Sequence, residues 1–277
     1  MPATKSGLPV IYHYYLRNYY RSRSFYLIFA LMLLVSALMV YLSIRYLPRI
    51  QDIMPVRGGL PPGEKERVLL YIWAYVLSDI PVFAAVFFSS PAISGEIENK
   101  TAFHIFTLPV DRSILLIGKY LAAVSASLIA MLPYLAAEVS TILYLFSFII
   151  AGPFLVSVGM VVMFIASISA FSFLISSLFN RNLYAYITTF IIYFVIFSSV
   201  GLVLQLLYNY NPFFLLNNAA SIIERVFINI SPGALTTQFS LNAAGSSDIL
   251  RSFVVMLLYN TLSLVFSLVA FERKEVR

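Results

Sequence analysis

Two carboxylates and a histidine lie close together in the stretch GEIENKTAFHIFTLPVDR, residues 95–112. Paired carboxylates can act as general acid and base, but Glu96 and Glu98 are two residues apart, which places them about 200° apart around a helix. The histidines, His13 and His104, form no HExxH zinc motif. The sequence contains no cysteine, which excludes disulfides, thiolate metal sites and cysteine nucleophiles. We therefore predict that the chain is not an enzyme and binds no metal.

Asp79 is the aspartate that lies inside a long apolar run, two residues before Pro81. An aspartyl intramembrane protease needs two such aspartates on neighbouring helices, so this class is disfavoured. A charged group within an apolar segment is costly and commonly functional, which favours a role in lining a transport pathway. The alternative is structural, with Asp79 bonding to backbone groups that Pro81 leaves free.

The apolar segments that hold these residues define the class of protein. The chain is 61% hydrophobic and 11% charged, with a mean hydropathy of +0.89. A bilayer core of about 30 Å requires about 20 helical residues, and period-two alternation typical of a membrane barrel is absent. We predict an all-α, polytopic membrane protein forming a single transmembrane domain over residues 1–277. Six runs are long enough to cross the bilayer: 25–44, 68–93, 114–145, 154–179, 183–208 and 252–271.

Six crossings place both termini on the same side of the membrane. Eleven of the 18 basic residues fall on the side of the termini, which predicts that this side is cytoplasmic and that the membrane is the cell membrane. The net charge of +6 is then explained by basic residues that flank helices and meet anionic lipid, and a nucleic-acid partner is not expected.

Two further segments are expected to meet the membrane without crossing it. Residues 8–24 are rich in tyrosine and arginine and are predicted to form an interfacial helix; a basic flank that anchors the first span is the alternative. Residues 209–251 are too apolar for a solvated loop and too broken for a full span. They are predicted to form an extracellular segment whose short helices re-enter the outer leaflet.

The loop of residues 94–113 contains the stretch first considered. Ser90 and Pro91 predict a break at the end of the second span, and Asp111 is placed to cap the third. A short helix over residues 102–108 would expose Phe103 and Phe106 on the cytoplasmic side. Large apolar side chains on such a helix indicate either a docking element for a partner or a loop that rests on the lipid interface.

The sequence from this loop into the third span, ISGEIENKTAFHIFTLPVDRSILLIGKYLAA, resembles the signature of the ABC-2 type permeases. The matching positions are Glu96, Glu98, Thr101, Leu108, Pro109, Val110, Arg112, Gly118 and Lys119. Lys100 and Asp111 depart from the residues usual in the family, glycine and serine. The six-span layout, the interfacial N-terminal helix and the broken segment before the last span are also similar to the family, and the branch that includes nitrous-oxide-reductase maturation and gliding-motility permeases is the most similar.

This resemblance implies a permease fold of the type V exporter kind and a role in ATP-driven export. The 94–113 loop would be the coupling helix that sits in a groove of a separate cytoplasmic ATPase. The docking residues carried over are Glu96, Glu98, Thr101, Phe103, Phe106, Pro109 and Arg112. The implied partners are two ATPase subunits and a second permease chain, identical or paralogous.

ATP and magnesium are expected in the ATPase and not in this chain. Gly118 and Lys119 look like the end of a phosphate-binding loop, but Tyr120 follows them and Ser113 replaces the first glycine, so no phosphate cradle forms. Two other classes of function stay open. A secondary transporter or channel would depend on Asp79 and Glu138, and a scaffold subunit would transport nothing.

Overall fold

The structure, a computed structural model, describes residues 7–46, 62–100, 111–147, 149–208, 210, 212–228 and 244–273. These described residues form helices and no strands. The helices are α1 (Gly7–Arg21), α2 (Arg23–Tyr46), α4 (Pro62–Ser89), η2 (Ser90–Ala92), α5 (Ser94–Glu98), α7 (Arg112–Phe146), α8 (Ala151–Leu178), α9 (Asn182–Phe190), η3 (Ile191–Phe197), α10 (Ser198–Tyr208), α11 (Leu216–Ala220), α12 (Ile222–Arg225) and α13 (Ser246–Arg273).

Six helical segments of the described chain are long and apolar enough to cross a membrane. They are α2, α4, α7, α8, the continuous series from α9 to α10, and α13. The structure thus confirms the six predicted spans and the all-α class. Most of these helices extend slightly beyond the predicted runs, because polar residues at a helix end can reach the headgroup region.

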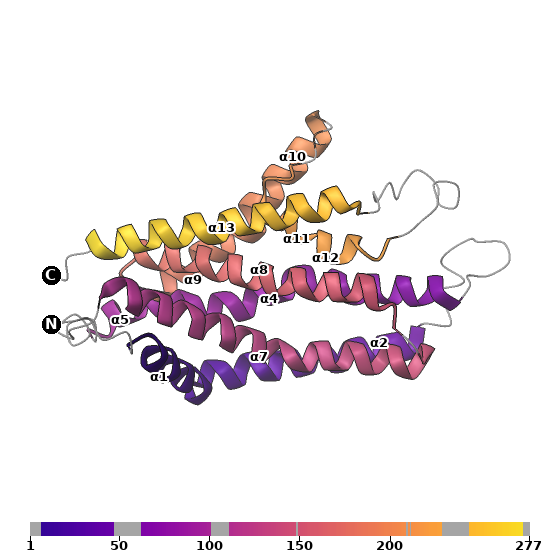
Figure 1. Ribbon diagram of the computed structural model, residues 1–277, viewed down its shortest axis with the longest axis horizontal. Coiled ribbons are helices and arrows are strands. Elements are labelled where there is room, and N and C mark those ends of the chain that lie inside the picture. The colour runs from indigo at the N-terminus through magenta and orange to yellow at the C-terminus, as the bar shows by residue number, and fades with distance from the viewer. Residues whose placement is uncertain are drawn as a thin grey trace.

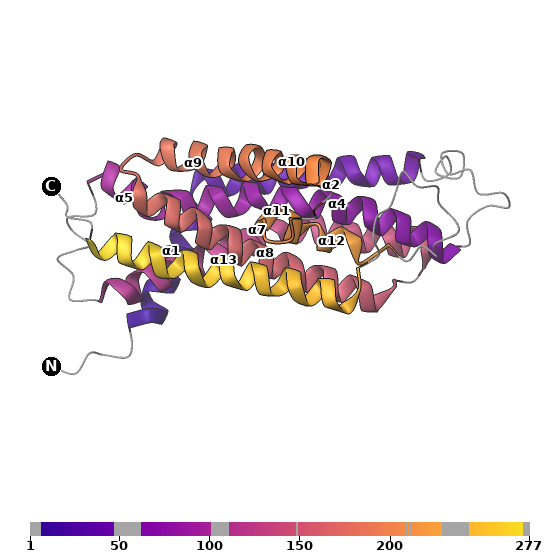
Figure 2. The same ribbon diagram turned by 90° about the horizontal axis from the view of Figure 1, so that it is seen from above.

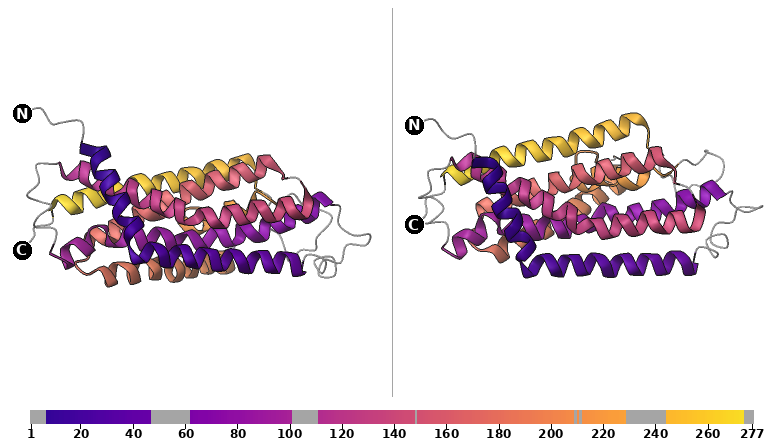
Figure 3. Two further views of the ribbon diagram at one scale, coloured as in Figure 1. Left: turned by 90° about the horizontal axis from the view of Figure 1, so that it is seen from below. Right: turned by 60° about the horizontal axis from the view of Figure 1, so that its bottom comes forward.

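The long helices run roughly along the long axis of the molecule (Figures 1 and 2). Short helix α5, the beginning of α7, the end of α8, the beginning of α9 and the end of α13 gather at one end of the bundle. This end is called the α5 end below. Helix α1 lies there too, and crosses the bundle obliquely before the chain turns into α2 (Figure 3).

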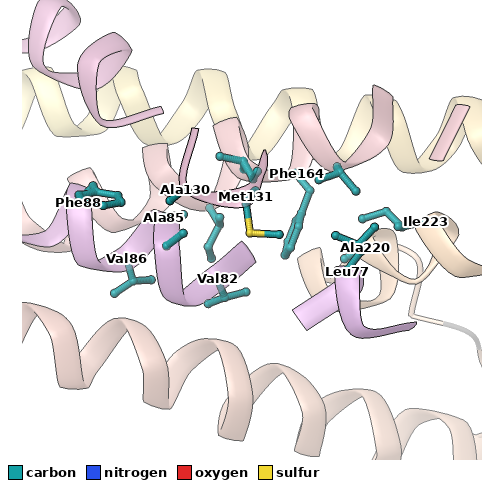
Figure 4. Packing of buried hydrophobic residues seen from close by; sticks show 14 of the residues in the cluster. Leu77, Val82, Ala85, Val86, Phe88, Ala130, Met131, Phe164, Ala220 and Ile223 are labelled. Carbon is teal, nitrogen blue, oxygen red and sulfur yellow. The ribbon is translucent and has the colours of Figure 1, made fainter. Parts of the chain in front are cut away.

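Helix α8 forms the centre of the bundle. It contains no charged residue and packs against α4, α7, α9 and α13. Serine and alanine side chains alternate with larger ones on its buried faces, and small residues allow membrane helices to approach one another closely. Phe164 of α8 lies in the hydrophobic core near Met131 of α7 and Val82 of α4 (Figure 4).

The segment of residues 209–251 supplies the short helices α11 and α12, which pack against α4, α8 and α13. Ala220 and Ile223 belong to the same core as Leu77 (Figure 4). The Ser157 hydroxyl of α8 donates a hydrogen bond to the Ile223 carbonyl over 2.8 Å, so a backbone group at the end of a short helix is satisfied by the bundle.

The fifth span is the least buried part of the bundle. Its middle section, η3, is a π-helix, and beyond it α10 diverges from the neighbouring helices (Figure 1). Tyr193 of η3 nevertheless reaches α4, where its hydroxyl donates to the Ser78 carbonyl, one turn before Pro81. Most of the exposed residues of α10 are apolar, among them Leu206 and Leu207, as expected of a surface in contact with lipid.

Candidate functional site

The structure describes the two ends of the 94–113 loop, residues 94–100 and 111–113. Of the positions predicted to dock a partner, Glu96, Glu98 and Arg112 are described. Thr101, Phe103, Phe106 and Pro109, and with them the helix predicted over 102–108, lie outside the described residues. The site can therefore be built from the two ends of the loop and from the elements that hold them.

The break predicted at Ser90 and Pro91 is confirmed. Helix α4 ends at Ser89, the three residues of η2 follow, and α5 begins at Ser94. A break leaves backbone groups without their helical partners, and within a membrane such groups need other partners. Here Ser176 of α8 supplies them: its hydroxyl oxygen accepts hydrogen bonds from the backbone N–H groups of Ile93 at 3.2 Å and Ser94 at 3.0 Å.

A further bond joins η2 to α8, and another joins α5 to η2. The hydroxyl groups of Ser90 and Ser172 lie 2.8 Å apart, and the Ser94 hydroxyl donates to the Ser90 carbonyl over 2.8 Å. All of these serines are buried. The short helix before the loop is therefore attached to the central helix of the bundle by hydrogen bonds.

Glu96 points into the bundle, where it forms an ion pair with Lys119 of α7. The Lys119 side chain is 1% exposed and that of Glu96 is 16% exposed, so the pair is largely removed from water. Lys119 also donates to the Ala92 carbonyl of η2 over 3.1 Å. A buried ammonium group needs such partners, because an unpaired buried charge is strongly destabilising.

Helix α1 joins this pair through Tyr15. Its hydroxyl donates to the other carboxylate oxygen of Glu96 over 2.9 Å, and its ring lies 5.1 Å from the Lys119 ammonium nitrogen. Burial, and then the negative charge of Glu96, raise the pKa of the Tyr15 hydroxyl above its usual range. The hydroxyl therefore remains protonated at physiological pH and acts as a donor.

Glu98, the last residue of α5, connects the loop to α9. Its carboxylate oxygen accepts a hydrogen bond from the backbone N–H of Asn182 over 2.8 Å. Asn182 is the first residue of α9, where N–H groups have no partner within the helix and a negative charge is favourable. The two glutamates thus contact different helices, as their two-residue spacing predicts.

At the other end of the loop, Arg112 donates from Nη1 to the Glu272 carbonyl in the last turn of α13, over 2.8 Å. Asp111 occupies the N-cap position of α7, as predicted, and its backbone is extended. Within the described residues its side chain makes no capping hydrogen bond, so the predicted position is correct and the capping interaction is not formed.

Gly118 is the point at which α1 crosses α7. A Cβ atom at this position would lie 2.6 Å from Cγ2 and 3.2 Å from Cβ of Ile11. These are branched-side-chain atoms close to the α1 backbone, so they cannot move aside without shifting the helix. The glycine is needed here for close approach of two helices.

We expect Gly118→Ala to destabilise the protein by about 1–3 kcal/mol, because the added methyl group overlaps Ile11. Gly159→Ala in α8 is a matched control, since a Cβ atom there meets nothing within 4 Å. Thermal unfolding of the two purified variants in one detergent measures the difference. Equal stability of the two variants would contradict the close crossing.

The sequence of the loop and of the helices around it matches a single family model. The family model described as ABC-2 family transporter protein matches residues 10–276. The chain is a member of the ABC-2 transporter family. No match to the sequence was found among curated proteins.

Membership makes this chain the membrane-spanning permease component of an ABC transporter, as the signature residues indicated. The match begins within α1 and continues through α13, so it includes both the crossing at Gly118 and the helices around the loop. The glycine and the lysine of the signature have separate structural roles. Gly118 allows α1 to pack closely against α7, and Lys119 forms an ion pair with Glu96.

Sequence reasoning missed several residues of the permease that hold the loop: Tyr15, Lys119, Ser172, Ser176 and Asn182. One signal could have found Lys119. A lysine in an apolar span must either reach the interface or find a buried partner, and the same signature contains two glutamates, Glu96 and Glu98, that could serve as that partner. The serines and Tyr15 have no comparable signal, since such residues are frequent in this chain.

Proposed function

We propose that the permease works as an exporter driven by a separate cytoplasmic ATPase, which docks on the 94–113 loop. The observation that supports this proposal is the attachment of α5, the short helix at the start of the loop. Side chains tie it to four helices: to α1 through Tyr15, to α7 through Lys119, to α8 through Ser176 and to α9 through Asn182. A displacement of the loop by a bound partner would be passed to all four.

In this proposal the docking residues divide into two groups. Phe103 and Phe106 contact the ATPase, together with Thr101 and Pro109. Glu96 and Glu98 hold the base of the loop, since their carboxylates bond within the permease. ATP and magnesium bind to the ATPase. This assignment is consistent with Lys119, whose ammonium group is buried against Glu96 and is not free to contact a phosphate.

We also propose that a second permease chain, identical or paralogous, covers part of this one. Ile72, Tyr75 and Asp79 form an exposed stripe on α4 with helical spacing. Asp79 lies near the middle of this span, within electrostatic range of Glu224 and Tyr193. A carboxylate at this depth facing lipid is costly, whereas a polar cleft between two permease chains would accommodate it as pathway lining.

The assembly is tested by co-expression of the permease with the ATPase encoded nearest to its gene, mild extraction and native mass measurement. We expect a complex of two permease chains and two ATPase subunits. ATP-dependent accumulation of cargo in inverted membrane vesicles would establish export. A single permease without ATPase, from membranes that contain both, would contradict the proposal and favour a scaffold or secondary transporter.

The proposed orientation predicts the labelling of single cysteines in this cysteine-free chain. A cysteine at Asn99, at the α5 end, should react with a membrane-impermeant maleimide only after the cells are opened. A cysteine at Ser246, at the start of α13, should react in intact cells, as should one at Gly59. Labelling of position 99 in sealed cells would place the loop outside, where no ATPase could dock.

A further inference from the structure

A groove runs along α1 at the α5 end of the bundle, with a cavity volume of about 720 Å³. One side of α1 forms its first wall, from Val10 to Arg21, a distance of roughly 17 Å at the helical rise of 1.5 Å per residue. The opposite wall comes from the end of α4, from α5 and from the beginning of α9. Its volume is in the range of pockets that bind small molecules.

The groove is amphipathic. Val10, Ile11 and Phe87 contribute apolar surface, and tyrosines from α1 and α9 contribute rings with hydroxyl groups. Aromatic side chains of this kind are enriched where a membrane meets water. Polar groups come from Asn18, Ser22, Ser24, Asn99 and Asn182.

The charge balance of the lining favours an anionic ligand. Among the residues that line the groove, Arg21 supplies the positive charge and Glu96 the negative charge. Lys119 neutralises Glu96 in the buried ion pair, so the exposed Arg21 guanidinium remains to meet a ligand. A guanidinium binds phosphate oxygens through two parallel hydrogen bonds.

The depth of the groove favours a lipid over a protein partner. Ser24 is the second residue of α2, Phe88 lies in the last turn of α4, and Tyr186 is in the second turn of α9. All three helices are spans, so the floor of the groove lies at the edge of the bilayer, where lipid headgroups are found. A cytoplasmic protein would have to enter that layer to fill it.

We propose that this groove binds an anionic phospholipid, with its phosphate at Arg21 and an acyl chain along the apolar wall beside Phe87. This proposal does not depend on the export proposal. It also places a lipid directly against Tyr15 and Glu96, which hold the loop.

The test uses the full-length permease in phosphatidylcholine nanodiscs that contain a small amount of phosphatidylglycerol with a photoreactive group in its acyl chain. After illumination we expect adducts on peptides that contain α1 and the end of α4. Arg21→Gln should lower the yield about tenfold, because a charge-assisted hydrogen bond is lost. Arg17→Gln, one turn earlier on α1 and outside the groove lining, should leave it within about twofold.

Two further probes identify what the groove recognises. Photoreactive diacylglycerol with the same chains should label weakly, because it lacks the phosphate, and millimolar inorganic phosphate should not displace the phospholipid. Equal labelling by diacylglycerol would show a nonspecific apolar crevice, and displacement by phosphate would show a site for a free anion. Either result would overturn the proposal, as would an equal loss of labelling in Arg17→Gln.

Two variants at Asn18 distinguish a groove that binds lipid from one that binds the ATPase. Asn18→Trp fills the groove from an exposed position on α1 and should abolish labelling, which keeps the test decisive if Arg21→Gln does not fold. A cysteine at Asn18 should not cross-link to the ATPase in the assembled transporter. Efficient cross-linking there, with loss of lipid labelling when the ATPase binds, would assign the groove to the ATPase and refute a lipid site.

Discussion

Lys119→Met is expected to destabilise the permease by about 3–5 kcal/mol, because it leaves the Glu96 carboxylate largely buried without its counter-charge. The same change removes the hydrogen bond to the Ala92 carbonyl and with it a direct link between α7 and the base of the loop. The variant should therefore unfold at a lower temperature in detergent, and transport per ATP hydrolysed should fall in the population that remains folded.

The double variant Glu96→Gln with Lys119→Met shows whether the ion pair itself is responsible. Removing both charges eliminates the unpaired group, so we expect most of the stability to return, since neutral replacements of buried ion pairs are often well tolerated. Lys65→Met, at a partly exposed position of α4, controls for loss of a lysine and should have little effect on stability. If the double variant loses as much stability as the sum of the losses in Glu96→Gln alone and Lys119→Met alone, the two residues do not act as a pair.

Phe103→Ala combined with Phe106→Ala is expected to release the ATPase from an intact permease. Aromatic anchors at interfaces commonly contribute about 2 kcal/mol or more each, so the two truncations together should weaken binding roughly a thousandfold. The permease itself should remain inserted and stable, because the bonds that hold α5 lie outside the changed positions. Co-purification of the ATPase, quantified against the permease, measures the loss.

Phe213→Ala combined with Phe214→Ala is the matched control, because it removes two exposed phenylalanines from the segment before α11. This variant should retain its ATPase. If the Phe103 and Phe106 variant also retains the ATPase and transports at the normal rate, the loop is an ordinary interfacial connection. The Lys119 variant and the Phe103 and Phe106 variant can be told apart. The first should lower the stability of the permease and its transport per ATP hydrolysed, whereas the second should weaken ATPase binding.

The class of protein could be predicted from the sequence alone, because it depends on local properties. A run of about 20 apolar residues must cross a bilayer wherever it lies in the chain. For the same reason the six spans and the break at Ser90 and Pro91 were predicted correctly. A proline acts on its own helix, so its effect requires no knowledge of the neighbouring helices.

The side chains with which the charged residues pair depend on the tertiary structure and could not be predicted from the sequence. From the sequence, Glu96 was expected to dock a partner and Lys119 was a position of the family signature without an assigned contact. In the structure the two form a largely buried pair, with Tyr15 bonded to Glu96 from a position 81 residues away. Nothing in an apolar span tells which face meets lipid and which meets another helix, since both surfaces favour the same residues. Helix crossings such as that of α1 at Gly118 determine which polar groups come within reach of one another, and these crossings result from the packing of the whole bundle.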